Sequence, residues 1–210
     1  MKMKALLFSV FVAVFALGAQ AQFVRLEVEE IDNKGLVPGK TYRVYAVFGQ
    51  EGDVIDAVYG EKSALLEIKS TTGFYQHERG GGMSSEVQKY DLTVVPELAY
   101  DSWVTIGRED NYMNHVNKFN MDFSAFDPAG GPISTDNGAW FVTPDKFQAK
   151  AGASKRILLM QLTSKGKITG VINIHGLHSI NGGDIFDEKG VRVNEAEEIR
   201  VEGLYFEAGE

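Results

Sequence analysis

The segment Arg156–Ile174 reads RILLMQLTSKGKITGVINI and gives the strongest indication of the fold. It holds two apolar, β-branched runs, Arg156–Leu162 and Lys167–Ile174, separated by the short polar sequence Thr163–Gly166. Runs of this length and composition are typical of strands, and Gly166 can supply the positive φ that a tight connection needs. The segment therefore predicts a β-hairpin.

The chain on either side of this segment follows the same pattern. Phe23–Glu30 (FVRLEVEE) alternates apolar and charged residues, as a half-buried strand does. Thr41–Phe48 (TYRVYAVF) is apolar on both faces, as an interior strand is. Further strands are expected at Val54–Tyr59, Ala64–Ile68, Tyr90–Val95, Trp103–Ile106, Val191–Val193 and Ile199–Phe206. About ten short strands with almost no helical periodicity predict one all-β domain, an antiparallel β-sandwich of jelly-roll type.

One long segment departs from the strand pattern. Gly107–Gly138 is rich in Asn, Asp, Gly and Pro and holds only isolated apolar residues such as Met121, Phe123 and Phe126. Loops longer than about 12 to 15 residues in a compact domain are usually functional. We expect a long surface excursion here.

The N-terminal 21 residues have the features of a secretory signal peptide. Lys2 and Lys4 precede the apolar run Ala5–Leu17, and Ala19–Ala21 form an Ala-x-Ala cleavage site. An apolar run of about 13 residues is shorter than the roughly 20 needed to span a bilayer. Removal of 21 of the 210 residues leaves 189, so residues 22–210 are expected to form the β-sandwich domain, secreted or displayed at the cell surface.

Charge and cysteine content restrict the partners. The formal net charge of −8 becomes −10 once the signal peptide, with two lysines and no acid, is removed. An acidic chain is poorly suited to nucleic acid or to anionic membranes, so neither is expected as a partner. No second apolar run is long enough to span a membrane, so no transmembrane segment is expected after cleavage.

The absence of cysteine excludes disulfides and thiolate chemistry, so the apolar core alone must stabilise the exported fold.

Two acidic loops make calcium a candidate cofactor. Asp127–Asn137 (DPAGGPISTDN) and Asn181–Gly190 (NGGDIFDEKG) offer carboxylate, amide and carbonyl oxygens, which are the ligands calcium prefers. The candidate ligands are Asp127, Asp136, Asp184 and Asp187. Neither loop matches the EF-hand template, and Asn, Asp and Gly also stabilise ordinary turns, so a structural role is the alternative.

A histidine pair offers a weaker candidate for a metal site. His175 and His178 are three residues apart, and side chains with that spacing on a strand point to opposite faces. They converge only if Gly176 breaks the strand. We expect one histidine at a strand end and the other in a loop.

Motifs for catalysis are weak in this sequence. There is no G-x-S-x-G elbow, and the run Gly80–Gly82 lacks the following Lys-Ser/Thr of a phosphate loop. Hydrolysis by a pair of Asp or Glu carboxylates needs only the right distance between them, which a sequence does not define. An Asp/Glu-dependent hydrolase is therefore the second alternative to a non-enzymatic domain.

Aromatic residues near the predicted loops indicate a binding function. Exposed rings on a β-sandwich can stack on the faces of sugars. The candidate ligand-binding residues are Tyr75, Tyr112, Asp136, Asn137 and Trp140. Trp103, in contrast, alternates with Val104 and Ile106 and is expected in the core. A carbohydrate-binding module is thus the first alternative.

The order and spacing of several segments resemble a known domain. These segments are TYRVYAVF (41–48), TTGFYQ (71–76), LAYDSWVTIG (98–107) and TDNGAWFVTPD (135–145), followed by the segment quoted first. Together they resemble an uncharacterised all-β domain that recurs in secreted and cell-surface bacterial proteins, and the resemblance spans Tyr42–Ile174. That family brings no known activity, ligand or catalytic residue. With the signal peptide, it implies a non-enzymatic extracellular or cell-envelope domain with a structural or adhesive role, contacting polysaccharide or other surface proteins.

Overall fold

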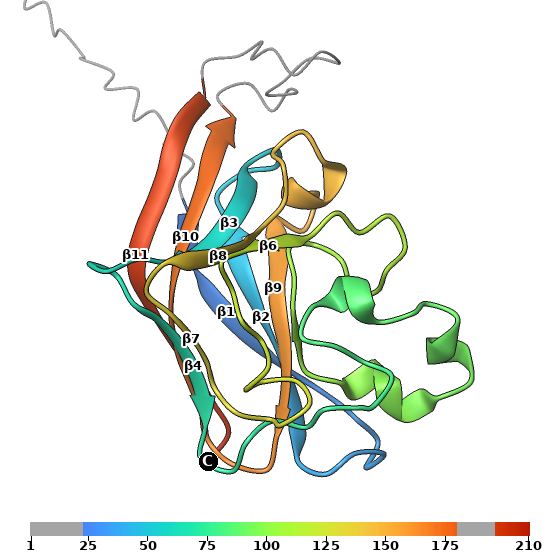
Figure 1. The fold of residues 1–210 in the computed structure, drawn as a ribbon. Helices are drawn as coiled ribbons and strands as arrows, with labels where there is room; N and C mark the ends of the chain where they lie inside the picture. Colours follow the sequence, from blue (N-terminus) through green and yellow to red (C-terminus); the bar gives the residue numbers. More distant parts are fainter. Residues whose placement is uncertain (1–22, 180–195) are drawn as a thin grey trace, which may run out of the picture.

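A computed structural model describes residues 23–179 and 196–210, and it is all-β, with two antiparallel sheets packed against each other (Figure 1). The β-sandwich class is confirmed. The predicted signal peptide and the strand expected at Val191–Val193 lie outside the described residues. Across the two described ranges, no helix has the length and apolar character required to cross a bilayer.

The smaller sheet has four strands in the order β1-β2-β9-β5. Their bounds are β1 Phe23–Ile31, β2 Lys40–Phe48, β9 Arg156–Ser164 and β5 Trp103–Val104. β2 pairs with β1 on one side and β9 on the other, which confirms the interior strand expected from its apolar sequence.

The larger sheet follows the order β6-β8-β3-β10-β4-β7, with β11 added along the other edge of β10. Its strands are β3 Val54–Gly60, β4 Leu66–Ser70, β6 Asn117–Phe119, β7 Ile133–Thr135, β8 Gly138–Phe141, β10 Ile168–Ser179 and β11 Ala196–Ala208. The long strand β10 holds this sheet together, because its first part pairs with β4, its second part with β3, and its opposite edge with β11.

The hairpin predicted at Arg156–Ile174 is wrong. Both strands exist, but β9 belongs to the smaller sheet and β10 to the larger one, so the turn between them carries the chain across the sandwich. Gly166 does not have a positive φ there. Glycine is needed for space instead, because an added Cβ would overlap the Thr71 hydroxyl oxygen.

The strand expected at Tyr90–Val95 is also wrong. This region forms short 3-10 helices, η1 Ser84–Glu86, η2 Asp91–Thr93 and η3 Pro96–Tyr100, drawn in green in Figure 1. Its apolar residues pack against the outer face of the smaller sheet. They form a second core with Val87, Leu98, Trp103 and Leu158, against which Tyr45, Leu92 and Val95 pack.

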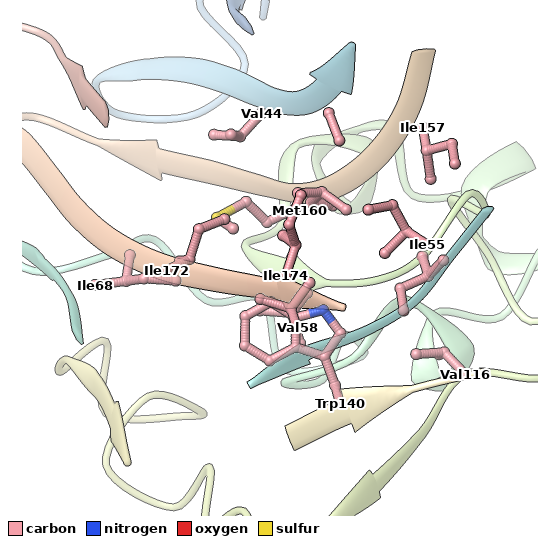
Figure 2. Close-up of a cluster of buried hydrophobic side chains, with 14 of the residues drawn as sticks. Val44, Ile55, Val58, Ile68, Val116, Trp140, Ile157, Met160, Ile172 and Ile174 are labelled. Atoms are coloured by element: carbon pink, nitrogen blue, oxygen red, sulfur yellow. The ribbon is translucent and has the colours of Figure 1, made fainter. Parts of the chain in front are cut away.

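The main core lies between the two sheets (Figure 2). Val44 from β2 and Met160 from β9 meet Val58 from β3 and Ile174 from β10, all fully buried. Trp103 is buried as expected, but in the second core on the far side of the smaller sheet.

The segment Gly107–Gly138 is only partly the surface excursion expected. It contains β6 and β7, and its apolar residues Met121, Phe123 and Phe126 are buried in the main core. The rings of Phe74 and Phe126 meet edge to face at 5.4 Å. An irregular segment can therefore place single apolar residues in the core even though its sequence has no strand or helix period.

Candidate functional site

A groove of about 410 Å³ opens on the outer face of the smaller sheet, beside the second core. Tyr45 lies in this groove because alternation along β2 turns Val44 and Ala46 toward the main core and Tyr45 away from it. The charged and aromatic side chains that line the groove are Glu29, Tyr45, Arg108, Glu109, Phe147, Lys150 and Arg156. A volume of this size is within the range of small-molecule sites, roughly 300 to 1,000 Å³.

Phe147 is the most exposed large apolar side chain of the described residues, at 80%. Phe147 is the first residue of the 3-10 helix η4, Phe147–Ala149, and the second residue, Gln148, is buried. The Gln148 side chain accepts the His115 N–H at 2.8 Å and donates to the Ile106 carbonyl at 2.7 Å. These bonds attach η4 to the chain at Ile106 and His115. The ring of Phe147 is therefore held at the edge of the groove, and the ring itself is exposed to solvent.

The loop that carries Arg108 is fixed directly against η4. Gly107 has a φ of 74°, and an added Cβ there would overlap the Gln148 carbonyl oxygen. The Thr105 hydroxyl donates to the Arg108 carbonyl at 2.6 Å. Arg108 and Phe147, each adjacent to one member of the Gly107–Gln148 contact, are thus held in a fixed relation to each other.

Carboxylates neutralise Arg156, which lines the groove, and Arg43, which pairs with a carboxylate of the groove. Arg156 forms ion pairs with Glu29 and, at 3.2 Å, with Glu27, and its guanidinium lies 3.8 Å from the centre of the Tyr45 ring. Arg43, from the same sheet, makes a bidentate pair with Glu109, with N–O distances of 2.8 and 2.7 Å. The acids of the groove are therefore already matched with bases.

Arg108 differs from these two arginines in having no carboxylate partner. Its guanidinium makes no hydrogen bond or ion pair with any residue in the part of the chain that the structure describes. The Nε atoms of Arg108 and Arg156 are both buried without a partner, but Arg156 is paired through its terminal nitrogens. Because Arg108 lines the groove, its uncompensated positive charge is available to an anionic group from outside the chain.

Trp140, predicted to bind a ligand, is a core residue, and that prediction is wrong. Its ring is fully buried beside Val58 and Ile174 (Figure 2), and its Nε1–H donates to the Thr105 carbonyl at 3.0 Å. The reason is the alternation of β8, which places Gly138 and Trp140 on the buried face. Trp140 has no ring face to offer to a sugar.

The other predicted binding residues, Tyr75, Tyr112, Asp136 and Asn137, do not line the groove. Tyr112 is 55% exposed, with the Lys89 ammonium 4.3 Å above its ring. Tyr75 is half-buried, and its pKa is raised by that burial and by the nearby Asp101. Asp136 and Asn137 are exposed between β7 and β8. The structure does not gather these four residues into one site.

The calcium hypothesis gains no support from the described residues. Within residues 23–179 and 196–210, no group of three or more His, Asp or Glu side chains is arranged to hold a metal ion. Asp127 is half-buried, and burial together with the Glu86 charge raises its pKa. Asp136 lies in the exposed segment after β7, and Asp184 and Asp187 are outside the described residues.

Both histidines of the sequence pair lie on β10, so the loop position expected for one of them is wrong. A bulge between His175 and Gly176 interrupts the pairing with β3. His175 Nδ1 lies 2.6 Å from Asp56 Oδ1, and His178 Nδ1 lies 2.7 Å from Asp53 Oδ1. The hydrogen bond to Asp56 raises the pKa of His175.

Asp101 is a buried carboxyl group that sequence reasoning missed. Its Oδ1 accepts the His77 N–H at 2.7 Å and its Oδ2 the Gly81 N–H at 3.2 Å. Burial disfavours the charged form more than these bonds favour it, so the pKa of Asp101 is raised to about 7. The run Gly80–Gly82 is explained by close packing, because an added Cβ would overlap Asp101 at Gly80, Glu86 at Gly81 and Phe123 at Gly82.

The groove residues were also missed, because they come from β1, β2, β9, η4 and the loop after β5. The one local signal was Phe147, an aromatic residue in the polar sequence Pro144–Lys150, where no strand or helix pattern required it. No protein-family model, curated protein or solved structure matches this chain, so its resemblance to a secreted bacterial β domain stays a prediction.

Proposed function

We propose that this chain is a secreted, non-enzymatic binding domain whose groove on the smaller sheet holds carbohydrate of the cell surface or its surroundings. The observation that carries this proposal is the exposed ring of Phe147 in the same groove as Arg108, Glu29 and Glu109. An adhesive role follows from such binding, with extracellular polysaccharide as the partner.

Saccharides have a surface that fits this arrangement. One face of a pyranose carries C–H groups that pack on an aromatic ring, and its edge carries hydroxyls that need donors and acceptors. Phe147 supplies the apolar surface, while carboxylates and guanidinium groups supply both kinds of hydrogen-bonding partner. Such a mixture of aromatic and convergent polar groups is typical of small-molecule sites.

Ion pairs and hydrogen bonds hold several groove side chains in place, which favours ligand binding. Arg156 is held over Tyr45 by two glutamates, and Arg43 is fixed to Glu109 by two hydrogen bonds. Side chains that are already ordered lose little conformational entropy when a ligand arrives. The groove is therefore preorganised over most of its surface.

A glycan array with matched variants tests the proposal. We expect the wild-type protein to bind a defined set of glycans and Phe147→Ala to bind them roughly 3- to 10-fold more weakly, because loss of one aromatic contact is worth about 0.5 to 1.5 kcal/mol. Phe119→Ala is the control, since Phe119 is 63% exposed but lies on β6 of the other sheet.

Three outcomes contradict the proposal. One is the absence of any glycan signal from folded wild-type protein. Another is an equal loss of binding in Phe147→Ala and Phe119→Ala, which would place the contact elsewhere. The third is cleavage of a bound glycan, detected by chromatography of the products, which would favour an Asp/Glu-dependent hydrolase.

A further inference from the structure

We propose that the ligand of the groove is an acidic saccharide and that Arg108 binds its carboxylate. This inference rests on the proposed function and names the class of carbohydrate. It concerns Arg108, which has no carboxylate partner among the described residues, whereas Arg156 in the groove and Arg43 beside it each have one.

The first argument is the balance of charge. Arg156 is compensated by Glu27 and Glu29, and Arg43 by Glu109. Arg108 makes no ion pair within the described ranges, although it lines the same groove. A neutral saccharide would leave this guanidinium uncompensated, whereas a carboxylate would complete the pattern that its neighbours already follow.

The second argument is the geometry of the Arg108 guanidinium, which makes no hydrogen bond within the described residues. A carboxylate accepts two parallel hydrogen bonds from two nitrogens of a guanidinium, a geometry that a single hydroxyl does not reproduce. Such a ligand would occupy these donors and balance the charge together.

The third argument is the fixed relation between Arg108 and Phe147, set by the contact of Gly107 with Gln148. A uronic acid carries an apolar C–H face and a carboxylate on one ring. Bound in the groove, it can place the first on Phe147 and the second on Arg108. An aliphatic acid has the carboxylate but no face for the ring.

Long polyanions are a poorer fit than short acidic saccharides. The chain has a formal net charge of −8, and Glu29 and Glu109 stand at the groove itself. The surrounding field opposes a long anionic chain, while one carboxylate in contact with Arg108 is attracted at short range. We infer a short acidic saccharide, of which one carboxylate contacts Arg108, rather than a long anionic polymer.

Calorimetric titration with a matched pair of trisaccharides tests this inference. We expect the galacturonic acid trimer to bind at least tenfold more tightly than the neutral galactose trimer. Arg108→Gln should lower the affinity for the acidic trimer to that for the neutral one. Lys62→Gln is the control, because it removes one exposed positive charge from the turn between β3 and β4 and should leave both affinities unchanged.

A second variant and two further probes give the remaining outcomes. Arg108→Lys keeps the charge and loses the bidentate geometry, so an intermediate affinity supports the assignment even if Arg108→Gln fails to fold. Sulfated galactose that binds as well as the uronic acid would show that Arg108 recognises the anionic charge and not a carboxylate, which overturns that part. Equal binding of a tetraglutamate peptide overturns the saccharide class.

The inference and the proposed function can fail separately. Equal affinity for the two trisaccharides, unchanged by Arg108→Gln, overturns the role of Arg108 while carbohydrate binding stands. Binding of neither trisaccharide, by a protein that also gives no glycan-array signal, overturns both.

Discussion

At the scale of single residues, the buried carboxyl group of Asp101 makes the stability of the fold depend on pH. Its carboxyl group accepts the N–H groups of His77 and Gly81, and its pKa is raised to about 7 from an ordinary value of 3.8. Between these two pH values the folded protein holds a proton that the unfolded chain releases. The folded state is therefore favoured as the pH falls through 7 and loses this advantage as the pH rises.

Asp101→Asn should remove this pH dependence. For the wild type, we expect the free energy of unfolding to decrease by on the order of 3 kcal/mol from pH 5 to pH 8 through this group. The variant cannot ionise, but its amide NH₂ would face the Gly81 N–H, so we expect a loss of about 1 to 3 kcal/mol at pH 5. Urea denaturation at several pH values measures both quantities.

His175 must be separated from Asp101 in this experiment. Its pKa is raised by Asp56, so the stability that it contributes is present below pH 6.5 and is lost as the pH rises through its folded-state pKa. The two groups thus act in the same direction. His175→Gln serves as the reference, and parallel pH profiles for wild type and Asp101→Asn would contradict the assignment to Asp101.

At the scale of elements, the strands were easier to predict than their partners. Alternation located β1, because burial of one face leaves a period of two in the sequence. Apolar and β-branched runs bounded by turn residues located β2, β3, β9 and β10 closely. Pairing depends on which edges meet in space. β9 pairs with β2, and β10 pairs with β11, although the turn between β9 and β10 is short enough for a hairpin.

The candidate site, like strand pairing, depends on which distant segments meet in space, and local sequence patterns do not give this. Tyr75, Tyr112, Asp136, Asn137 and Trp140 were selected because aromatic and polar residues stood near predicted loops. The structure buries Trp140 and leaves the other four outside the groove. The groove instead combines side chains from five separate segments, which no local pattern could bring together.

Gly107→Ala tests how the loop and η4 shape the groove. The φ of 74° and the overlap of an added Cβ with the Gln148 carbonyl predict a loss of roughly 1 to 3 kcal/mol in stability and a displacement of η4. We expect weaker saccharide binding than in the wild type at a temperature where both are folded. Gly152→Ala is the control, since an added Cβ there meets no atom within 4 Å.

For this prediction, thermal melts and titration are measured together. Unchanged stability and affinity in Gly107→Ala would show that the groove does not depend on the close approach of the loop to η4. A loss of the same size in Gly152→Ala would show a general effect of glycine replacement.

At the scale of the whole molecule, the smaller sheet has two different faces. One closes the main core against the larger sheet, and the other carries the second core and, beside it, the groove. With no cysteine in the chain, these two apolar clusters stabilise the fold without disulfides. We propose that the exposed part of this outer face binds an acidic saccharide.

Chemical-shift mapping by NMR tests that claim most directly. The ¹⁵N-labelled protein would be titrated with the galacturonic acid trimer and its amide resonances followed. We predict that the largest shifts occur at Arg108, Phe147 and Arg156. Shifts concentrated at Tyr112 or at Asp136 and Asn137, or no shifts at millimolar trimer, would contradict the account.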